Sequence, residues 1–208
     1  MSILSAREVT YEYRNAYQTV RAVNGVSCEF EQGRVYAIVG SSGSGKTTFL
    51  SLLACLDVPT SGTIALDGQS TAEIDRDEYR LNHVSVIYQN FNLFQHLTVL
   101  ENAAYPLYVR KISGREADAV AREKLLQVGL TEDQLGRLPN MLSGGEQQRV
   151  AIARALASGS EIILADEPTG NLDSTNSRNI VEILHRLAHE NDRCVIIVTH
   201  DPAVAEAA

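Results

Sequence analysis

Residues 40–47 read Gly-Ser-Ser-Gly-Ser-Gly-Lys-Thr and directly follow the apolar run Val35–Val39. They satisfy the pattern G-x-x-x-x-G-K-[ST] of a phosphate-binding loop, which lies between a strand and a helix. The glycines let backbone amides turn toward one point, Lys46 adds a mobile cation, and the Thr47 hydroxyl is a ligand for Mg²⁺. A helix terminus contributes at most about 2 kcal/mol, whereas micromolar binding needs about 8 kcal/mol, so these groups must act together. The stretch predicts a nucleoside triphosphate site rather than an idle glycine-rich turn.

Length, charge and apolar content restrict the class of protein. The chain has 208 residues, of which 44% are hydrophobic, and this suits one large domain or a domain with an inserted lobe. The net charge is −8 and no run of Lys or Arg is present, which disfavours a nucleic-acid partner. The first residues lack the apolar core of a signal peptide, and no uncharged apolar stretch reaches the roughly 18 residues of a membrane span. We therefore expect a soluble, intracellular protein.

Cysteine and histidine spacing gives no metal site. Cys28, Cys55 and Cys194 are an odd number and lie far apart in apolar surroundings, as is typical of buried thiols. His185 and His189 are four residues apart on a predicted helix, but no third ligand is nearby. A solvated helix face is the simpler interpretation of that pair.

Four short apolar runs each end at a polar residue, and their ranges are Val35–Val39, Val84–Tyr88, Ile162–Ala165 and Val195–Thr199. Such strands, separated by helical stretches, predict a parallel sheet that is covered on both faces. Ligands of such sheets lie beyond the carboxyl ends of the strands, so we expect Gly40, Gln89, Asp166, Glu167 and His200 to gather around one cleft. For Gln89 or His200 considered alone, the alternative to a role in the cleft is a purely structural one, because every strand must end at some polar residue.

The remaining segments predict two further layers. Alternating apolar residues and turn residues indicate half-exposed antiparallel strands at Ile3–Tyr13, Val20–Phe30 and Gly62–Leu66. The pattern becomes helical over residues 90–157, with one helix at 115–128 ended by Gly129, and Pro106 and Pro139 bracket this stretch. We therefore predict a largely helical lobe inserted between the second and third strands of the parallel sheet.

A second glycine turn, Leu-Ser-Gly-Gly-Glu-Gln-Gln at 142–148, opens a helix. Ser143 and Glu146 have the spacing of a capping box, and free amides at a helix start favour phosphate. The turn therefore predicts a second anion site, with a simple helix cap at Ser143 as the alternative.

Asp166 and Glu167 follow directly on an apolar run, and neighbouring side chains of an extended chain point in different directions. Asp166 can hold the Mg²⁺ that Thr47 also meets, while Glu167 can orient or deprotonate the water that attacks the terminal phosphate. For Glu167 the alternative is a surface ion pair.

From about Ile3 to its last residues, the chain resembles an ATP-binding cassette (ABC) ATPase. The family's motifs occur in its order, as the Walker A motif at 40–47, the Q-loop Gln89, the signature at 142–148, the Walker B motif at 162–167, the D-loop at 171–173 and the switch histidine His200. The resemblance implies an α/β, P-loop NTPase fold and a single ABC ATPase domain over residues 1–208. Its RecA-like core with a parallel sheet, together with an N-terminal antiparallel β subdomain, would take residues 1–89 and 158–208. The inserted α-helical subdomain, residues 90–157, would carry the signature.

The resemblance also implies ATP and Mg²⁺ as ligands and gives each motif a role. Two copies would bind two ATP molecules head to tail, each ATP lying between the Walker A motif of one copy and the signature of the other. The catalytic residues implied are Lys46, Gln89, Glu167 and His200, and the metal ligands implied are Thr47, Gln89 and Asp166. The nucleotide-binding residues implied are Tyr13, Gly40, Ser41, Ser42, Gly43, Ser44, Gly45, Lys46, Thr47, Thr48, Ser143, Gly144, Gly145 and Asp173. Tyr13 would stack on adenine, with Tyr11 as the competing candidate.

Residues 56–62, 92–102 and 165–173 are similar to one branch of the family, which includes macrolide exporters, lipoprotein-release ATPases, antimicrobial-peptide exporters and the cell-division ATPase FtsE. The branch implies a homodimer on the cytoplasmic face of the plasma (inner) membrane that powers a separate membrane-spanning permease. Phe91, Leu93 and Phe94 would line the groove for that partner, or else pack in the core. An FtsE-like regulator of cell-wall hydrolysis is the alternative function. Family members generally continue further beyond the switch histidine, so the carboxyl end is expected to be either truncated or unusual.

Two related classes fit less well. A chromosome-maintenance or DNA-repair ATPase head needs a long coiled-coil insertion between the Walker A motif and the signature, and residues 48–141 lack sustained heptads. A translation factor of the same superfamily needs two cassettes, whereas this sequence contains one set of motifs.

Overall fold

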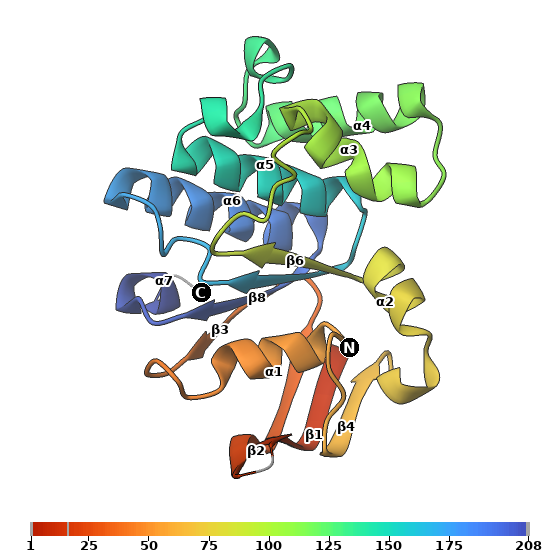
Figure 1. The fold of residues 1–208 in the computed structure, drawn as a ribbon, viewed down its shortest axis with the longest axis vertical. Coiled ribbons are helices and arrows are strands. Elements are labelled where there is room, and N and C mark those ends of the chain that lie inside the picture. Colours follow the sequence, from red (N-terminus) through yellow and green to blue (C-terminus); the bar gives the residue numbers. More distant parts are fainter. Residues whose placement is uncertain (1, 16, 207–208) are drawn as a thin grey trace.

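The computed structural model describes residues 2–15 and 17–206, which form two β-sheets with helices on their faces and above them (Figure 1). The main elements are β1 Ser2–Arg14, β2 Thr19–Glu31, β3 Val35–Val39, α1 Lys46–Leu53, β4 Ser61–Leu66, β5 Gln69–Ser70, α2 Arg76–Asn82, β6 Val84–Tyr88, α3 Val99–Val109, α4 Gly114–Gln127, α5 Gly144–Ala157, β7 Ile162–Asp166, α6 Ser174–Asn191, β8 Cys194–Thr199 and α7 Pro202–Glu206. Short 3-10 turns lie at Thr71–Glu73, Glu132–Gln134 and Pro139–Met141.

The first sheet is antiparallel and has the strand order β2-β1-β4-β5. β1 lies in its middle and pairs with both β2 and β4. Its buried residues, among them Leu4, Ala6 and Val9, lie in the core, while Glu8 and Glu12 lie toward solvent or surface ion pairs. The three antiparallel strands predicted from alternation are confirmed, with β1 and β2 each somewhat longer than predicted.

The second sheet is parallel and has the order β3-β8-β7-β6. The predicted ranges of β3 and β6 are confirmed, and β7 and β8 are each one residue longer than predicted. Val39 pairs with Thr199 and Tyr88 pairs with Asp166, so the four strands end nearly level with one another. This register places the residues that follow the strands along a single edge of the sheet.

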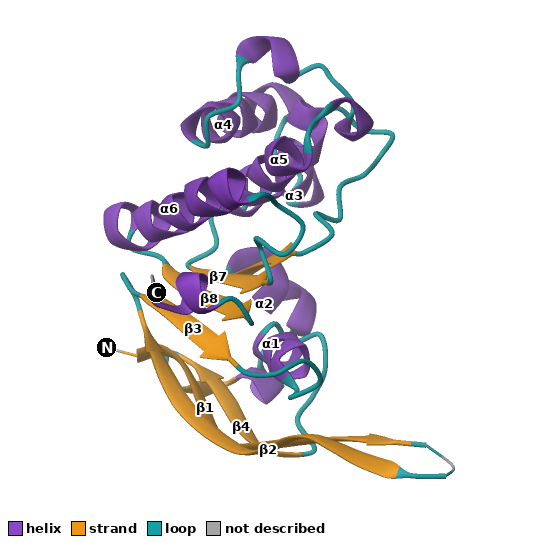
Figure 2. Cartoon of the chain, turned by 90° about the vertical axis from the view of Figure 1, so that its left-hand side faces the viewer, coloured by secondary structure: helices purple, strands orange, loops and turns teal. Residues whose placement is uncertain are grey.

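Both faces of the parallel sheet are buried, which explains why its strands are apolar throughout. Along β7, Ile162 and Leu164 belong to the core shared with α1 and the antiparallel sheet, whereas Ile163 and Ala165 belong to the core shared with α3–α6. Alternate side chains of a strand point to opposite faces, so each face needs its own apolar set. Each fully buried Ile or Leu contributes roughly 1.5–3 kcal/mol to stability. Figure 2 shows α3–α6 on one side of the sheet and α1 with the antiparallel strands on the other.

The inserted segment is helical, as predicted, and consists mainly of α3, α4 and α5 packed against one another. The helix predicted at 115–128 is α4, and Gly129 follows it with φ 85°, which a glycine adopts without strain. Pro106 does not border the helical segment, because it lies inside α3, three residues before that helix ends. Among residues 2–15 and 17–206, no helix has the length and apolar character needed to cross a membrane.

Candidate functional site

The phosphate loop connects β3 to α1, as the pattern predicts, and α1 begins at Lys46. Gly43 and Gly45 have φ values of 78° and 89°, a region that glycine enters without the steric cost of a Cβ atom. At Gly45 the requirement is also spatial, because a Cβ atom there would lie 2.0 Å from the carbonyl oxygen of Ala22 in β2. The antiparallel sheet therefore lies in direct contact with the loop at Gly45, and this close approach leaves no room for a side chain there.

Lys46 lies across the mouth of its own loop. Its Nζ donates to the carbonyl oxygens of Gly40 and Ser41 at 2.8 and 2.9 Å. These bonds hold the ammonium group over the loop at the amino end of α1, where the helix dipole also favours an anion. The loop thus holds the Lys46 ammonium group beside the amino end of α1.

Thr47 and Asp166 meet at the carboxyl edge of the parallel sheet. The Thr47 Oγ1 donates to Asp166 Oδ1 at 3.1 Å, although the two residues are 119 positions apart. Burial raises the pKa of Asp166 above its usual range, and the hydrogen bond from Thr47 opposes part of that shift. A hydroxyl beside a partly desolvated carboxylate is an oxygen donor set of the kind that Mg²⁺ prefers.

We predict that Asp166→Asn stabilises the nucleotide-free protein at neutral pH. The raised pKa means that the folded state binds this proton more tightly than the unfolded state, so stability falls as the pH rises through the interval between the ordinary and the raised pKa. Asparagine removes that penalty and still offers an oxygen to Thr47. Thermal unfolding at pH 7 should show a higher midpoint for Asp166→Asn.

The matched control for this prediction is Asp67→Asn, which neutralises an exposed carboxylate of the same type. The increase in the unfolding midpoint that Asp166→Asn causes should become smaller toward the acid side of that pH interval. There the wild-type carboxyl is protonated and is therefore neutral, like the asparagine. An unchanged or lower midpoint at pH 7 would contradict the assigned cause of the pKa shift.

Glu167 and His200 form the closest contact of the site, with 2.6 Å between Glu167 Oε2 and His200 Nδ1. Glu167 has φ 47°, an unusual value for a non-glycine residue, and its amide donates to the Val198 carbonyl at 2.9 Å. Strain of this kind is found at functional sites. The Glu167 side chain is 21% exposed and that of His200 is 63% exposed, so the pair is accessible from the protein surface.

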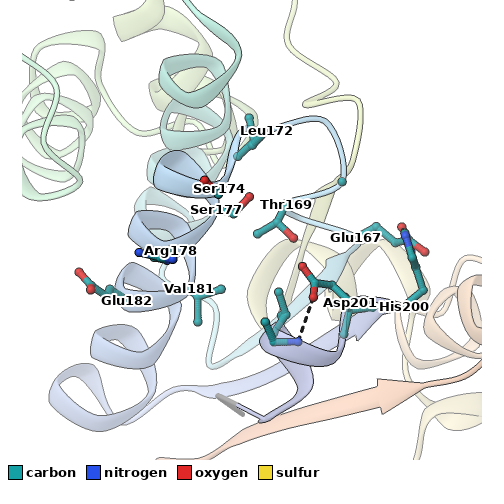
Figure 3. Close-up of a pocket in the computed structure, with 14 residues that line it drawn as sticks. Glu167, Thr169, Leu172, Ser174, Ser177, Arg178, Val181, Glu182, His200 and Asp201 are labelled. Carbon is teal, nitrogen blue, oxygen red and sulfur yellow. Dashed lines mark hydrogen bonds and ion pairs between the residues drawn. The ribbon is translucent and has the colours of Figure 1, made fainter.

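The pair borders a cavity of about 650 Å³ that lies between α6 and α7 (Figure 3). Leu172 and Val181 give the cavity an apolar side, while Ser174 and Ser177 line it with hydroxyl groups. Two of the predicted catalytic residues, Glu167 and His200, are therefore in direct contact at the border of this cavity.

Gln89 follows β6 at the same edge but is turned toward the D-loop. A Cβ atom on Gly170 would lie 2.6 Å from Gln89 Nε2, so the amide packs against the Gly170 backbone. Asn171 Nδ2 donates to the Gln89 carbonyl oxygen at 3.1 Å. The structure therefore brings Thr47 and Asp166 into direct contact, and it places the Gln89 side chain against Gly170.

Two tyrosines lie near the phosphate loop. The hydroxyl of Tyr13 is 3.3 Å from Thr48 Oγ1 and forms a hydrogen bond with it, and the ring is half exposed. Tyr11 lies edge-on to Tyr13 at 5.0 Å, and burial, followed by the charge of Asp57, raises the pKa of Tyr11. Tyr13 is therefore the tyrosine with a free face beside the loop.

The second glycine turn opens α5 with a complete capping box. Ser143 Oγ accepts from the Glu146 amide, and the Glu146 carboxylate accepts from the Ser143 amide at 2.7 Å. The Ser143 hydroxyl and the Ser143 amide both donate to the Glu146 carboxylate at 2.7 Å, and these two hydrogen bonds lower the pKa of Glu146. A Cβ atom on Gly145 would lie 2.4 Å from Asn176 Oδ1, so this glycine lets the turn pack closely on the first turn of α6. Asp173 caps α6 by accepting the Asn176 amide, and this bond lowers the pKa of Asp173.

Within the part of the chain that the structure describes, the two glycines of this turn lie against Phe91, the D-loop and α6, and none of these nearest neighbours belongs to the phosphate loop. Ser143 itself is exposed. The helix cap considered as an alternative for Ser143 is thus present, and the same residue remains open to a ligand supplied from outside its own chain.

The three residues predicted to line a partner groove have different surroundings. Leu93 is buried in the core with α3 and α5, so core packing is the correct interpretation for this residue. Phe91 packs partly on the same core. Phe94 is 42% exposed, and its ring contacts Tyr105 of α3 at 4.4 Å between centroids. Phe94 and Tyr105 form an aromatic surface pair.

The remaining predictions concern cysteines and histidines. Cys55 and Cys194 are buried, Cys28 is half-buried, and all three are free thiols. The rings of His185 and His189 stack at 5.9 Å along α6. Within residues 2–15 and 17–206, no group of three or more His, Cys, Asp or Glu side chains is arranged to hold a metal ion.

Comparison with known proteins gives consistent matches along the whole chain. A family model described as "ABC transporter" matches residues 23–170. The chain is 40% identical over 206 residues to the uncharacterized ABC transporter ATP-binding protein YclH of Bacillus subtilis, covering 99% of this chain and 90% of YclH. It is 41% identical over 210 residues to the macrolide export ATP-binding/permease protein MacB of Salmonella typhimurium. That match covers 100% of this chain but 32% of MacB, so the chain spans about one third of that relative.

Solved structures match equally well. The dimeric structure of MJ0796, described as a bacterial ABC transporter cassette, superposes with a TM-score of 0.90 and 39% identity, covering 99% of this chain and 91% of that chain. A dimeric structure of the same cassette in a post-hydrolysis state with ADP and Pi gives the same TM-score and identity.

Proposed function

This chain belongs to the ABC transporter family, and on that premise we propose that it binds and hydrolyses ATP as a head-to-tail dimer that powers a separate membrane-spanning partner. The family and the α/β, P-loop fold predicted from the sequence are confirmed. We propose one ABC ATPase domain over residues 1–208, with the core in 1–89 and 158–208 and the signature lobe in 90–157. The observation that carries the proposal is the arrangement of Lys46, Asp166 and the Glu167–His200 pair along one sheet edge.

In the proposed site, the phosphates of ATP lie on the loop from Gly40 to Thr48, where Lys46 supplies positive charge and the backbone amides donate. The same loop includes Ser41, Ser42, Gly43, Ser44, Gly45 and Thr47. Tyr13 stacks on the adenine ring, a contact worth about 1–3 kcal/mol. The hydrogen bond between Tyr13 and Thr48 supports this assignment over Tyr11, because it places the exposed ring beside the loop.

Thr47 and Asp166 are the residues we propose to hold Mg²⁺, with Gln89 as a further ligand. The fit rests on the 3.1 Å contact between Thr47 and Asp166 and on the desolvation of that carboxylate, which a cation relieves. When bound, Mg²⁺ would supply positive charge that offsets the negative charge developing on the phosphate during transfer. For Gln89 to join, its amide has to turn away from Gly170.

We assign Glu167 as the general base that orients and deprotonates the attacking water. His200, 2.6 Å away, holds this carboxylate at the cleft and can contact the terminal phosphate. The positive φ of Glu167 turns its side chain off the strand direction of β7, so that Asp166 and Glu167 serve different atoms of the same reaction.

Ser143, Gly144 and Gly145 are assigned to the ATP bound by the partner copy. The exposed Ser143 at the start of α5 supports this, since within its own chain the turn contacts α6 and the D-loop. Asp173, which caps α6 beside that turn, is assigned to the same shared interface. Each ATP then lies between the phosphate loop of one copy and the signature turn of the other, and hydrolysis releases the two copies.

The shared site predicts that two inactive variants restore activity when mixed. Lys46→Ala alone lacks the loop cation in both sites, and Ser143→Arg alone places a bulky side chain in the space that the phosphate bound by the partner must occupy. A mixed dimer contains one intact site, built from the Lys46 of one copy and the Ser143 of the other. Phosphate release from an equimolar mixture should recover to about a quarter of the wild-type rate, because half of the random dimers carry one good site of two.

Thermal unfolding of each variant is the control for this mixing experiment, since loss of the Ser143 cap costs about 1 kcal/mol. If two well-folded variants stay inactive together, or if Ser143→Arg alone is fully active, each site is complete within one chain and the proposed dimer is wrong.

For the partner and location, we propose a permease on the cytoplasmic face of the plasma (inner) membrane. The permease would contact the surface near Phe91 and Phe94, and the exposed Phe94–Tyr105 pair supports this face. The similarity to a macrolide export ATP-binding/permease protein supports transport over the FtsE-like alternative. No nucleic-acid partner is proposed, in keeping with a net charge of −8.

A further inference from the structure

The turn that follows Gln89 is strained at two successive residues. Phe91 and Asn92 have φ values of 60° and 46°, in the left-handed region that non-glycine residues seldom enter. The Asn92 amide donates to the Asn90 carbonyl oxygen at 2.6 Å, across Phe91, which is the hydrogen bond of a γ-turn. With a positive φ at its central residue, this is the rare and strained form of that turn. Such a turn persists only where neighbouring groups hold it.

The group that holds the turn is the guanidinium of Arg154 in α5. Arg154 Nη1 donates to the Asn92 carbonyl oxygen at 2.7 Å, and Nη2 donates to the Phe91 carbonyl oxygen at 3.0 Å. The planar fork of an arginine suits two neighbouring acceptors. Arg154 is half-buried, and none of the ion pairs among the described residues includes it. Its partly desolvated charge is therefore directed to the carbonyls of this one turn.

The same turn contacts two other segments of the site, the D-loop and the second glycine turn. Asn171 Nδ2 of the D-loop donates to the Gln89 carbonyl oxygen and to Asn90 Oδ1, both at 3.1 Å. The ring of Phe91 lies beside the signature turn, where a Cβ atom on Gly144 would be 3.7 Å from Phe91 Cζ. A change in this turn therefore reaches Gln89 on one side and the signature turn on the other.

We propose that Arg154 is a positioning residue for ATP hydrolysis, which holds the Phe91–Asn92 turn in its strained form and thereby sets Gln89 at the edge of the sheet. The inference rests on the proposed ATPase function and adds a residue that touches neither nucleotide nor water. Without the guanidinium, Phe91 and Asn92 relax toward negative φ. Gln89, two residues before Phe91, then loses its position beside Gly170 at the carboxyl edge of the sheet, while the phosphate loop keeps its shape.

The test is Arg154→Met, assayed as the intact dimer. We expect kcat to fall about 10-fold to 100-fold, as for a small displacement of a positioned group, while the Kd for ATP stays at its wild-type value. Arg122→Met is the matched control, because Arg122 lies in the same lobe on α4 but pairs with Glu132 at the surface. Arg154→Lys, which keeps the charge without the planar fork, should lose part of kcat and serves if Arg154→Met folds poorly.

Rescue by glycine separates positioning from general stability. Asn92→Gly adopts a positive φ without a Cβ penalty, so adding it to Arg154→Met should restore most of kcat. A normal kcat in Arg154→Met, or a low kcat that Asn92→Gly does not improve, overturns the inference.

Amide hydrogen exchange of residues 89–94 gives a readout that does not need activity. Arg154→Met should speed exchange in this segment without lowering the thermal midpoint, and unchanged exchange overturns the inference. If the wild-type chain hydrolyses no ATP, the proposed function fails instead, and the exchange result still decides whether Arg154 holds the turn.

Discussion

Glu167→Gln will bind ATP, close into a stable dimer and hydrolyse the nucleotide about 100-fold to 10,000-fold more slowly than the wild type. Glutamine has nearly the same shape as glutamate and still offers an oxygen to His200 Nδ1, which lies 2.6 Å from the wild-type carboxylate. The substitution therefore removes the base without rearranging the site. Because hydrolysis is what separates the two copies, light scattering with ATP should report twice the monomer mass, and phosphate release should nearly stop.

Glu182→Gln is the matched control for Glu167→Gln. It makes the same chemical change at an exposed carboxylate that lines the same cavity from α6. This variant should hydrolyse ATP at the wild-type rate and remain in exchange between monomer and dimer. A Glu167→Gln protein that is saturated with ATP yet scatters as a monomer would count against the shared site, and one that retains full turnover would remove Glu167 from the role of base.

Lys46→Ala will lose both tight ATP binding and measurable turnover. The Lys46 ammonium lies 2.8 and 2.9 Å from two carbonyl oxygens of the loop, which fixes it where the phosphates are proposed to lie. Hydrogen bonds to charged groups contribute about 1.5–3 kcal/mol each, so the loss of two such bonds between Lys46 and phosphate oxygens weakens ATP binding roughly 100-fold or more. Titration with a fluorescent ATP analogue measures the affinity, and phosphate release measures the turnover.

For Lys46→Ala, the control is Lys124→Ala on α4, which removes a lysine that pairs with the neighbouring Glu123. Both variants should unfold near the wild-type temperature, because Lys46 contacts only its own loop through the bonds described. Wild-type phosphate release from Lys46→Ala would mean that the phosphates lie elsewhere.

Much of the fold could be predicted because its signals are local. The runs Val35–Val39 and Val84–Tyr88 are apolar throughout, and they are strands with those bounds in the structure. Both faces of this sheet are buried, so every position of such a strand favours an apolar residue. The resulting apolar run can be recognised in the sequence without knowing which strands and helices pack against it. Pro106 was misread as a border because a proline weakens a helix without always ending it, and it lies within α3.

The site was predicted only in part, because residue type at a strand end does not specify direction. Gln89 follows β6 as expected, yet its amide packs against Gly170. Leu93 has the same apolar character as the exposed Phe94 but is buried, and only the packing of α3 and α5 separates the two. Sequence reasoning did not find Arg154 at all, since its acceptors are backbone carbonyls 62 and 63 residues away, and backbone atoms leave no mark in a sequence.

The sequence alone therefore determined the phosphate loop, the two strand patterns, the helical insertion and the family, because each depends on residues within a few positions of one another. Tertiary structure decided which groups meet: Thr47 with Asp166 across 119 positions, Glu167 with His200, and Arg154 with the Phe91 turn. The physical reason is that backbone conformational preferences and the periodic spacing of apolar side chains depend on residues that are only a few positions apart in the chain. Contacts between distant residues arise only when the sheets and helices pack, and their distances and directions are fixed by that packing.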